Sequence, residues 1–260
     1  MEVAGQPAAS SEALLANLVA AGRELAWSRP GVGAVAGAVG RLLAAAYRQA
    51  HLDADELRCV VREEAQALVD GRRRAAASIA IQLRERLTDA VVLTHSASAT
   101  VREALLLTPP ERVLCTVSYP FEEGRGFAEE LAGAGLDVDL VDDEEAPGAL
   151  AEASLLLVGA DTVFRDGTLC NKVGTRHLAA TAADELVPTV VACEVIKLAP
   201  VDADQAPKPA GVAQTLFDLT PPHLIEQVVT EEGTFASDDV GALVDRTPFL
   251  REGYALLQPS

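Results

Sequence analysis

The sequence predicts an α/β protein in which a helical N-terminal domain is followed by a doubly wound and mostly parallel sheet. Two observations predict this class: apolar residues recur at helical spacing up to about residue 87, and short apolar runs then alternate with helical segments. A third agrees: aromatic residues make up only 4% of the chain, so small and aliphatic side chains must build the core. We predict two domains, at residues 1–87 and 88–260.

The first domain is predicted to consist of helices. The glycine-rich stretch at 31–37 follows no strand and lacks the spacing of a dinucleotide-binding loop, so we predict a close-packed helix that starts after Pro30. Asp53 is a suitable N-cap for the next helix, Gly71 is a suitable terminator, and an alanine-rich helix follows over 75–87. The apolar stripes consist of Leu57, Val61, Ala65 and Leu68, then Ile79, Leu83 and Leu87.

The second domain is predicted to alternate strands with helices. The apolar runs that favour strands are 90–94, 112–117, 138–141, 155–158, 189–192 and, more weakly, 227–230. Helical segments lie between them at 98–107, 126–134, 147–151 and 175–186. Because parallel strands need crossovers of about this length, we expect helices on both faces of one sheet. The proline-bearing stretch 201–209 is predicted to be a loop.

Composition excludes several classes of function. The chain has a net charge of −18, and its only lysines are Lys172, Lys197 and Lys208, which argues against direct nucleic-acid binding. The four cysteines are widely spaced and have no histidine at ligand spacing, so we expect no disulfide framework, no metal site and no cofactor. No apolar stretch approaches the roughly 20 residues of a membrane span, so we expect no membrane contact and a cytoplasmic location.

The first candidate site follows the first predicted strand. Ligands of parallel sheets bind beyond the carboxyl ends of strands, so the residues after each apolar run are the place to look for chemistry. Here the run ends in small, hydroxylated residues that lead into a helix, namely Ser96, Ser98 and Thr100. Backbone N–H groups and hydroxyls at this point favour an anion-binding nest; the alternative is that Ser96 or Ser98 only caps the helix.

A second candidate site combines Asp161, directly after the fourth strand, with Lys172, about ten residues later among turn residues. The carboxylate suits hydroxyls or a proton, and the ammonium suits a phosphate. Asn171 and Thr175 add hydrogen bonds, and the helix start at Gly174 adds a second anion site. The alternative is that Asp161 caps a turn and that Lys172 is solvated.

A third candidate site follows the fifth strand, where Glu194 and Lys197 form either an ion pair that faces a ligand or an exposed loop pair. The histidines lack triad partners in the sequence, and we expect each to be structural. They are His51, His95, His177 and His223.

Several of these segments together resemble a known family. They are Val-Leu-Thr-His-Ser at 92–96, Glu-Gly-Arg at 123–125, Val-Gly-Ala-Asp at 158–161, Asn-Lys-Val-Gly-Thr at 171–175 and Leu-Phe-Asp-Leu-Thr-Pro-Pro at 216–222. The chain resembles the initiation factor 2B alpha, beta and delta subunits, whose superfamily includes methylthioribose-1-phosphate and ribose-1,5-bisphosphate isomerases. The resemblance covers roughly residues 90–232. It implies a Rossmann-like domain, a homodimer or larger homo-oligomer, and a pocket for a phosphorylated sugar or nucleotide.

The resemblance also shows where this chain departs from the isomerases. They carry a cysteine after Thr-His, where this chain has Ser96, and a Glu-x-Arg-Pro motif, where it has Val-Ser-Tyr-Pro at 117–120. Asp161 and the Asn-Lys pair at 171–172 are retained. A serine hydroxyl needs an activating base, and His95 is the only nearby candidate in the sequence.

Two functions follow as hypotheses. The first is a binding or regulatory protein, similar to initiation factor 2B subunits, because the stretch 193–197 resembles that branch more than the isomerases. The second is an aldose–ketose isomerase acting on ribose-1,5-bisphosphate or a related sugar-1-phosphate. In it Asp161 moves the proton, Ser96 replaces the thiol, and Lys172 with Arg125 or Arg29 neutralises phosphate. A structural subunit with a vestigial pocket is the third alternative.

Overall fold

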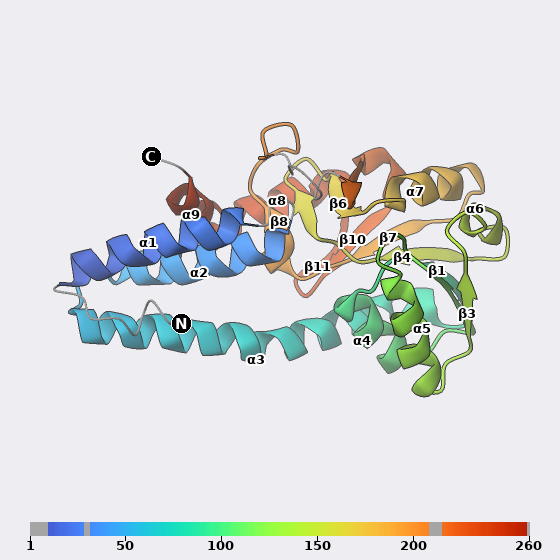
Figure 1. Ribbon diagram of the computed structural model, residues 1–260, viewed down its shortest axis with the longest axis horizontal. Helices are drawn as coiled ribbons and strands as arrows, with labels where there is room; N and C mark the ends of the chain where they lie inside the picture. Colours follow the sequence, from blue (N-terminus) through green and yellow to red (C-terminus); the bar gives the residue numbers. More distant parts are fainter. Residues whose placement is uncertain (1–9, 29–31, 208–214, 259–260) are drawn as a thin grey trace.

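The computed structural model describes residues 10–28, 32–207 and 215–258, and it shows an elongated molecule with helices at one end and a sheet at the other (Figure 1). The helical end contains α1 (Ser11–Trp27), α2 (Gly33–Arg48) and the first half of α3 (Ala54–Leu87). The C-terminal helix α9 (Pro248–Leu257) returns to this end and packs against α1 and α2. The crossing of α2 and α9 is close, because a Cβ added to Gly253 would lie 2.4 Å from the Gly40 backbone.

One long helix, α3, replaces two predicted helices. Asp53 caps it as predicted, and its carboxylate accepts two backbone hydrogen bonds of 2.9 Å from the first turn. The prediction that Gly71 ends this helix is wrong, because α3 continues to Leu87. A glycine inside a helix costs only about 1 kcal/mol relative to alanine, and burial of side chains such as Val61 and Ile79 on either side stabilises the helix by more.

Helix α3 also joins the two ends of the molecule. Its first half packs against α1 and α2, and its second half packs against α4 (Ala99–Leu107) and the strand β10 (Gln227–Thr230). The division of the chain at residue 87 therefore stays a prediction, since α3 crosses between the helical end and the sheet without a break and α9 belongs to the helical end.

The main sheet confirms the predicted fold class. Its strand order is β11-β10-β7-β4-β1-β2-β3, and every neighbouring pair is parallel except β10 with β11. Six of these strands match the predicted runs; β11, which forms a hairpin with β10, was not predicted. The remaining bounds are β1 (Val91–Thr94), β2 (Arg112–Thr116), β3 (Val138–Val141), β4 (Leu155–Val158), β7 (Thr189–Ala192) and β11 (Gly233–Ala236).

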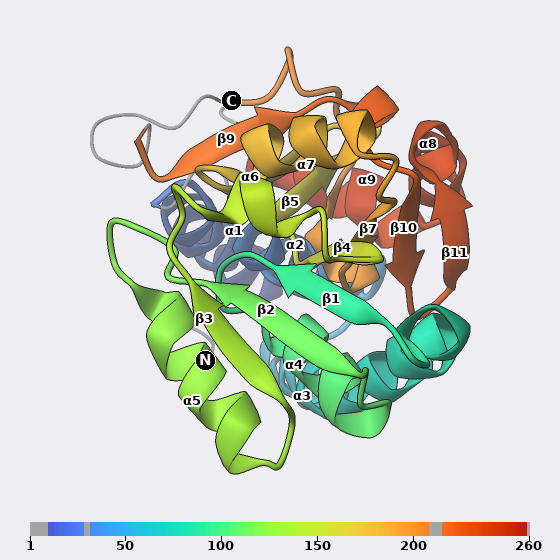
Figure 2. The same cartoon turned by 90° about the vertical axis from the view of Figure 1, so that its right-hand side faces the viewer.

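Helices cover both faces of this sheet, as Figure 2 shows from its edge. One face packs against α3, α4 and α5 (Glu123–Gly133), and the other against α6 (Ala146–Ala149), α7 (Thr175–Asp184) and α8 (Val240–Asp245). Neighbouring strand residues alternate between the two cores: Val92 belongs to the first and Leu93 to the second. Both faces are buried, which explains why the strands are continuous apolar runs in the sequence.

A second, smaller sheet was not predicted. Its order is β8-β5-β6-β9, from β5 (Thr162–Phe164), β6 (Leu169–Lys172), β8 (Leu198–Ala199) and β9 (Phe217–Thr220). A short turn of 3₁₀ helix, η2 (Val195–Lys197), precedes β8, and another, η4 (Pro222–Leu224), follows β9; a third, η5 (Ser237–Asp239), follows β11 of the main sheet. Asn171 and Lys172 thus lie in a strand rather than in the predicted turn. The loop predicted at 201–209 contains no helix or strand over its described part, 201–207.

Candidate functional site

Three side chains meet at the carboxyl edge of the main sheet, and we call them the rim cluster: Ser96, Glu123 and Lys172. Ser96 follows β1, Glu123 is the first residue of α5, and Lys172 is the last residue of β6. The Ser96 hydroxyl donates to Glu123 Oε1 at 2.8 Å, and Lys172 Nζ lies 2.7 Å from Glu123 Oε1 and 2.9 Å from Oε2. Lys172 is 6% exposed, so it is not the solvated lysine that the alternative interpretation assumed.

Glu123 is the charge that organises the rim cluster. Burial has the largest single effect on its pKa and opposes its ionisation. The hydrogen bonds from Lys172 and Ser96, a backbone hydrogen bond and the charge of Lys172 together outweigh burial and hold the pKa of Glu123 below its usual value. The carboxylate is therefore ionised at neutral pH and cancels the Lys172 charge. Sequence reasoning named Glu123 only within a motif. The available signal was its position at the start of a helix beyond a strand's carboxyl end.

The turn between β1 and α4 holds Ser96 in an unusual backbone conformation. Ser96 has φ +67°, in the left-handed region, and its backbone N–H donates to Ser118 Oγ at 2.8 Å. Such a conformation costs about 1–3 kcal/mol unless surrounding contacts support it. Ser98, not Ser96, caps α4, because its hydroxyl accepts the Val101 N–H at 3.3 Å. The side chain of Ser96 is thereby left facing Glu123.

His95 does not contact the Ser96 hydroxyl, contrary to its proposed role as the activating base. Its Nε2 lies 2.9 Å from the Val173 carbonyl oxygen and must donate there, so Nδ1 accepts from the Thr116 hydroxyl at 2.7 Å. Thr116 Oγ1 lies 2.7 Å from Ser118 Oγ, which accepts the Ser96 N–H. His95 is buried and structural, as the sequence predicted for all histidines, and it supports the turn through two hydroxyls.

This arrangement makes stability depend on pH. Burial lowers the pKa of His95, more than its bond to the Val173 carbonyl and nearby carboxylates raise it. The folded state then favours the neutral ring, so the contribution is complete above about pH 6.5 and is lost as the pH falls below that value toward the folded pKa. We expect urea denaturation to give a lower free energy of unfolding at about pH 5.5 than at about pH 7.5, with at most about 1.4 kcal/mol per pH unit from this proton. The slope should flatten in His95→Gln; an unchanged slope would contradict the assignment.

Asp161 lies beside the rim cluster, as predicted from its place after β4. Burial raises the pKa of its carboxyl, Lys197 and Lys172 oppose this, and Glu123 adds to it. Lys197 Nζ donates to the Ala160 carbonyl at 2.8 Å. The structure thus brings Asp161, Lys172 and Lys197 to one edge of the sheet. Of the two carboxyls here, Asp161 is the better proton carrier, because its raised pKa lies closer to neutral pH.

The close-packed helix start predicted within 31–37 is confirmed for its described part and docks on this edge. The Gly33 N–H donates to the Asp161 carbonyl oxygen at 2.9 Å and to Thr162 Oγ1 at 2.8 Å. A Cβ added to Gly37 would lie 1.9 Å from the Ile196 carbonyl oxygen, so only glycine allows α2 to approach η2 this closely. Pro30 and Arg29, a predicted phosphate ligand, lie outside the described residues.

Two predicted ligand residues, Asn171 and Thr175, form hydrogen bonds to other groups of the chain. Asn171 Nδ2 donates to Thr175 Oγ1 at 3.1 Å, and the Thr175 hydroxyl donates to the Lys172 carbonyl at 2.6 Å, so both side chains fix the turn from β6 into α7. The predicted anion site at the start of α7 is wrong, because Asp218 occupies it and accepts the Gly174 N–H at 2.8 Å. Pairing of β6 with β9 places Asp218 opposite Asn171.

The loop after β2 and the first turn of α5 carry polar groups that also bind within the chain. The backbone N–H groups of Ser118 and Tyr119 donate to the Asp143 carboxylate at 2.7 and 2.9 Å. Arg125, predicted to neutralise phosphate, instead donates to Glu122 Oε2 at 2.6 Å, with both side chains about half exposed. Arg125 is thus part of a surface ion pair, and ligand binding by this residue stays a prediction.

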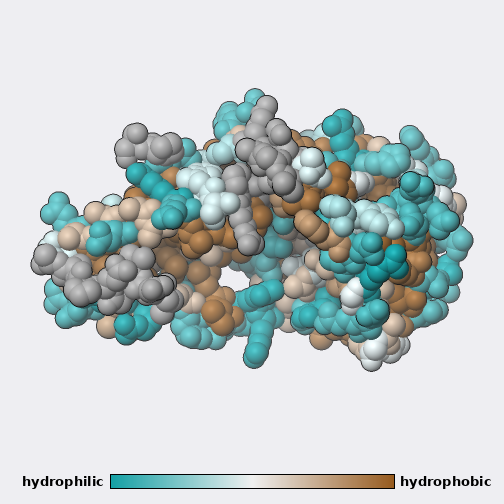
Figure 3. Space-filling model, in the orientation of Figure 1, coloured by the Kyte–Doolittle hydropathy of each residue, from teal (hydrophilic) through white to brown (hydrophobic). Residues whose placement is uncertain are grey.

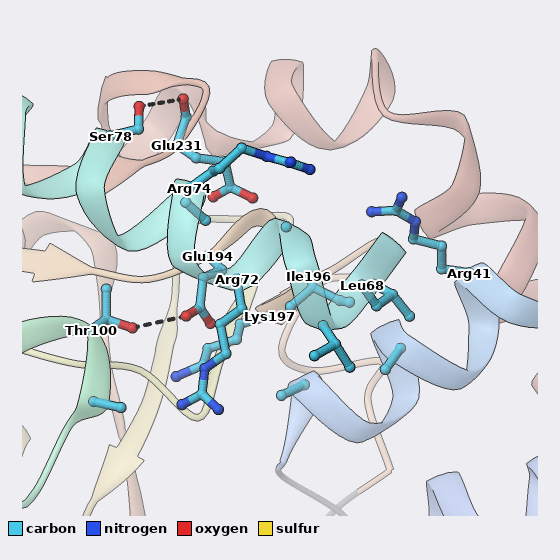
Figure 4. Close-up of a pocket in the computed structure, with 16 residues that line it drawn as sticks. Arg41, Leu68, Arg72, Arg74, Ser78, Thr100, Glu194, Ile196, Lys197 and Glu231 are labelled. Atoms are coloured by element: carbon cyan, nitrogen blue, oxygen red, sulfur yellow. Dashed lines mark hydrogen bonds between the residues drawn. The ribbon is translucent and has the colours of Figure 1, made fainter. Parts of the chain in front are cut away.

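Glu194 and Lys197 do not form the predicted ion pair. Thr100 donates to Glu194 Oε1 at 3.3 Å, whereas Lys197 binds the Ala160 carbonyl. Both residues line a cavity of about 680 Å³ between α2, α3 and the residues that follow β7 and β10 (Figure 4). Figure 3 shows the molecular surface hollowed between α3 and the layer above it.

The part of the chain that the structure describes shows neither a metal site nor a membrane-spanning helix. Among those residues, no group of three or more His, Cys, Asp or Glu side chains is placed to hold a metal ion. No described helix is both long and apolar enough to cross a membrane.

Comparison with known proteins decides the family. The sequence model of the initiation factor 2 subunit family matches residues 2–206. The chain belongs to this family. The eIF-2B subunit 2-like translation initiation factor of Pyrococcus abyssi is 34% identical over 179 residues, which cover 64% of this chain and 64% of that protein. The ribose 1,5-bisphosphate isomerase of Haloferax volcanii is 29% identical over 262 aligned positions, covering 91% of this chain and 80% of that protein.

Solved structures of eIF2B proteins support the fold. The tetrameric eIF2B beta-delta complex of C. thermophilum aligns with a TM-score of 0.79 at 22% identity, covering 94% of this chain and 84% of that chain. The eIF-2B structure of Pyrococcus horikoshii OT3 aligns with a TM-score of 0.65 at 23% identity, covering 90% and 94%. The chain spans less than two thirds of the length of the Pyrococcus relatives it matches in sequence, 56% and 64% for two of them. Membership of the initiation factor 2 subunit family therefore leaves both named activities as hypotheses.

Proposed function

We propose that this member of the initiation factor 2 subunit family is a binding or regulatory protein, similar to eIF-2B subunits, that holds a phosphorylated sugar or nucleotide at the rim of its sheet. We propose further that it works in the cytoplasm as a homodimer or larger homo-oligomer. The observation that supports the binding role is the rim cluster itself, in which Glu123 bonds both Ser96 and Lys172. Ser96 stands at the position that would carry acid–base chemistry in an isomerase. Its hydroxyl is bonded to Glu123, and Lys172 neutralises the charge of that carboxylate.

The chemistry of the cluster disfavours the usual proton transfer. An aldose–ketose isomerisation needs groups that give and take a proton near neutral pH. The Ser96 hydroxyl faces a carboxylate whose pKa is lowered, and such a carboxylate is a weak base. No cysteine takes over: burial raises the pKa of three thiols to about 12, and the fourth lies on α3. The buried ones are Cys115, Cys170 and Cys193, and the exposed one is Cys59.

A ligand that binds at the rim must compete with Glu123 for the Lys172 ammonium. A phosphate reaches Lys172 only by displacing or sharing Glu123, because that carboxylate already holds the ammonium. Lys197 has donors beyond the one that binds Ala160, and Asp161 can accept from hydroxyls. The net charge of −18 repels anions at long range, so these few groups must supply the affinity.

A second candidate function is isomerisation of ribose-1,5-bisphosphate or a related sugar-1-phosphate. One observation favours it: Asp161, with its raised pKa, lies on the same edge as two lysines and as the Ser96–Glu123 pair. In that function Asp161 moves the proton and Ser96 takes the place of the thiol.

One set of measurements tests both functions. We expect isothermal titration with ribose 5-phosphate, AMP and ribose-1,5-bisphosphate to show binding of at least one, and ¹H NMR of the same mixtures to show no turnover. Lys172→Met should weaken that binding by about 1–3 kcal/mol, the scale of a lost charge-assisted hydrogen bond. The control Arg84→Met removes one positive charge from an exposed position on α3 and should leave affinity unchanged.

The opposite outcomes are equally clear. Turnover that Asp161→Asn abolishes would establish the isomerase and overturn the binding role as the main function. Equal affinity in Lys172→Met and the parent would show that the ligand does not bind at the rim cluster. A lack of binding to all three compounds would favour a structural subunit.

A further inference from the structure

The cavity beside the rim cluster is large enough for a ligand of its own. Its volume of about 680 Å³ lies within the range of small-molecule sites, roughly 300–1,000 Å³. None of the three rim-cluster residues lines it. Its walls come from α2 and α3 on one side, and from α4, η2 and the turn after β10 on the other.

Two arginines of α3 line this cavity without partners of their own. Arg72 and Arg74 are exposed, and no hydrogen bond or ion pair with another described residue engages either guanidinium. Arg41, by contrast, is paired with Glu64 and stacks over an aromatic ring. In Figure 4, Arg72 points to the same end of the cavity as Lys197. That end fits a phosphate.

Two carboxylates also line this cavity. Glu194 accepts a hydrogen bond from Thr100 at 3.3 Å, and Glu231 Oε2 accepts one from the Val195 N–H at 2.9 Å. A carboxylate has about four acceptor positions, so both keep acceptor capacity toward the cavity. Burial raises the pKa of Glu231, and the charge of Glu194 adds to this. A ligand group that donates hydrogen bonds, above all an amino group, would relieve their mutual repulsion.

The surface between the charged parts is apolar and is formed by Ala38, Leu68, Ala75 and Ile196. The cavity thus combines a cationic end, an apolar body and a pair of acceptors. We propose that it binds a small phosphate ester that carries an amino group, with the phosphate at Arg72 and Lys197 and the amino group at Glu194 and Glu231. This site goes beyond the proposed function, because none of the rim-cluster residues lines it, although Lys197 borders both, and because it selects for a different group.

Matched ligands and variants test the proposal by isothermal titration. Glucosamine 6-phosphate and glucose 6-phosphate differ by an amino group in place of a hydroxyl, and AMP and IMP by an amino group in place of a carbonyl. We expect the amino member of at least one pair to bind roughly tenfold more tightly, and Glu231→Gln to remove that preference. Arg72→Ala should weaken the binding roughly tenfold. Arg73→Ala is the control, since Arg73 is exposed beside Arg72 but does not line the cavity.

Four results would overturn the site. Equal affinities within both pairs would refute amino recognition, and equal losses in Arg72→Ala and Arg73→Ala would reduce the effect to general charge. A complete lack of binding refutes it directly. Loss of the amino preference in Lys172→Met would place the ligand at the rim cluster instead. The two proposals fail separately, because rim binding depends on Lys172 and cavity binding on Arg72.

Discussion

Replacing Gly124 by alanine is expected to destabilise the protein by about 2–3 kcal/mol, the cost of forcing extra atoms into a packed site. A Cβ at this position would lie 1.8 Å from the Thr116 carbonyl oxygen and 2.9 Å from that of Val117, both of which are backbone atoms that cannot rotate away. The first turn of α5 must then move away from the end of β2. Because Glu123 precedes Gly124, the rim cluster should lose its geometry as well.

The neighbouring glycine of the same helix provides the control. Gly126 is exposed, and nothing lies within 4 Å of the Cβ that an alanine would add. Gly126→Ala should therefore stabilise the protein by about 0.5–1 kcal/mol through helix propensity. Urea denaturation of both variants measures the difference. Similar free energies of unfolding for the two would show that α5 does not pack on β2 as described.

Removal of the Glu123 charge should strengthen ligand binding at the rim cluster. Glu123→Gln keeps the size of the side chain and an acceptor for the Ser96 hydroxyl, but it leaves Lys172 beside a neutral amide. We expect affinity for phosphate esters to rise roughly tenfold, about 1.4 kcal/mol, because the phosphate no longer competes with a carboxylate for the ammonium. Stability should fall at the same time, since a buried ammonium loses its partner.

Glu122→Gln separates this effect from a general loss of negative charge. Glu122 is adjacent in sequence, but its carboxylate pairs with the exposed Arg125 rather than with Lys172. Surface pairs of this kind contribute about 0–1 kcal/mol, so neither affinity nor stability should change much. Titration of ribose 5-phosphate against both variants gives the comparison. If Glu122→Gln tightened binding as much as Glu123→Gln, the rim cluster would not be what limits affinity.

The alternation of apolar runs with helical segments was sufficient to predict six strands of the main sheet and the helices on both of its faces. Strands buried on both faces must be apolar throughout, so β4 and β7 are visible in the sequence without any partner being known. The second sheet had no such signal, because β5 and β8 have only three and two residues and because β6 and β9 are interrupted by polar residues such as Asn171, Lys172 and Asp218. The length of α3 was not predicted from local signals, because burial of side chains before and after Gly71 outweighs the weak preference of this glycine to end a helix.

The candidate site, like the fold, was predicted only in part. Asp161 and Lys172 were predicted to hold one ligand because Asp161 follows a strand and Lys172 comes about ten residues later among turn residues. The structure brings both to one edge of the sheet, with Lys172 at the end of the unpredicted strand β6. The partner of Lys172 was not predicted: Glu123 lies 49 residues away along the chain, and only the pairing of strands brings the two together. Asp218 is a similar case, because the β6–β9 ladder carries its carboxylate to the α7 start that had been expected to attract a ligand.

From the order of its residues alone, this chain defines an α/β fold, the family it resembles and the edge of the sheet where chemistry belongs, because periodicity and strand-end position are local properties. The folded molecule decides which charges neutralise one another and which stay available to a ligand. That outcome depends on distances between side chains from separate elements, and electrostatic and hydrogen-bond energies change steeply over a few ångströms.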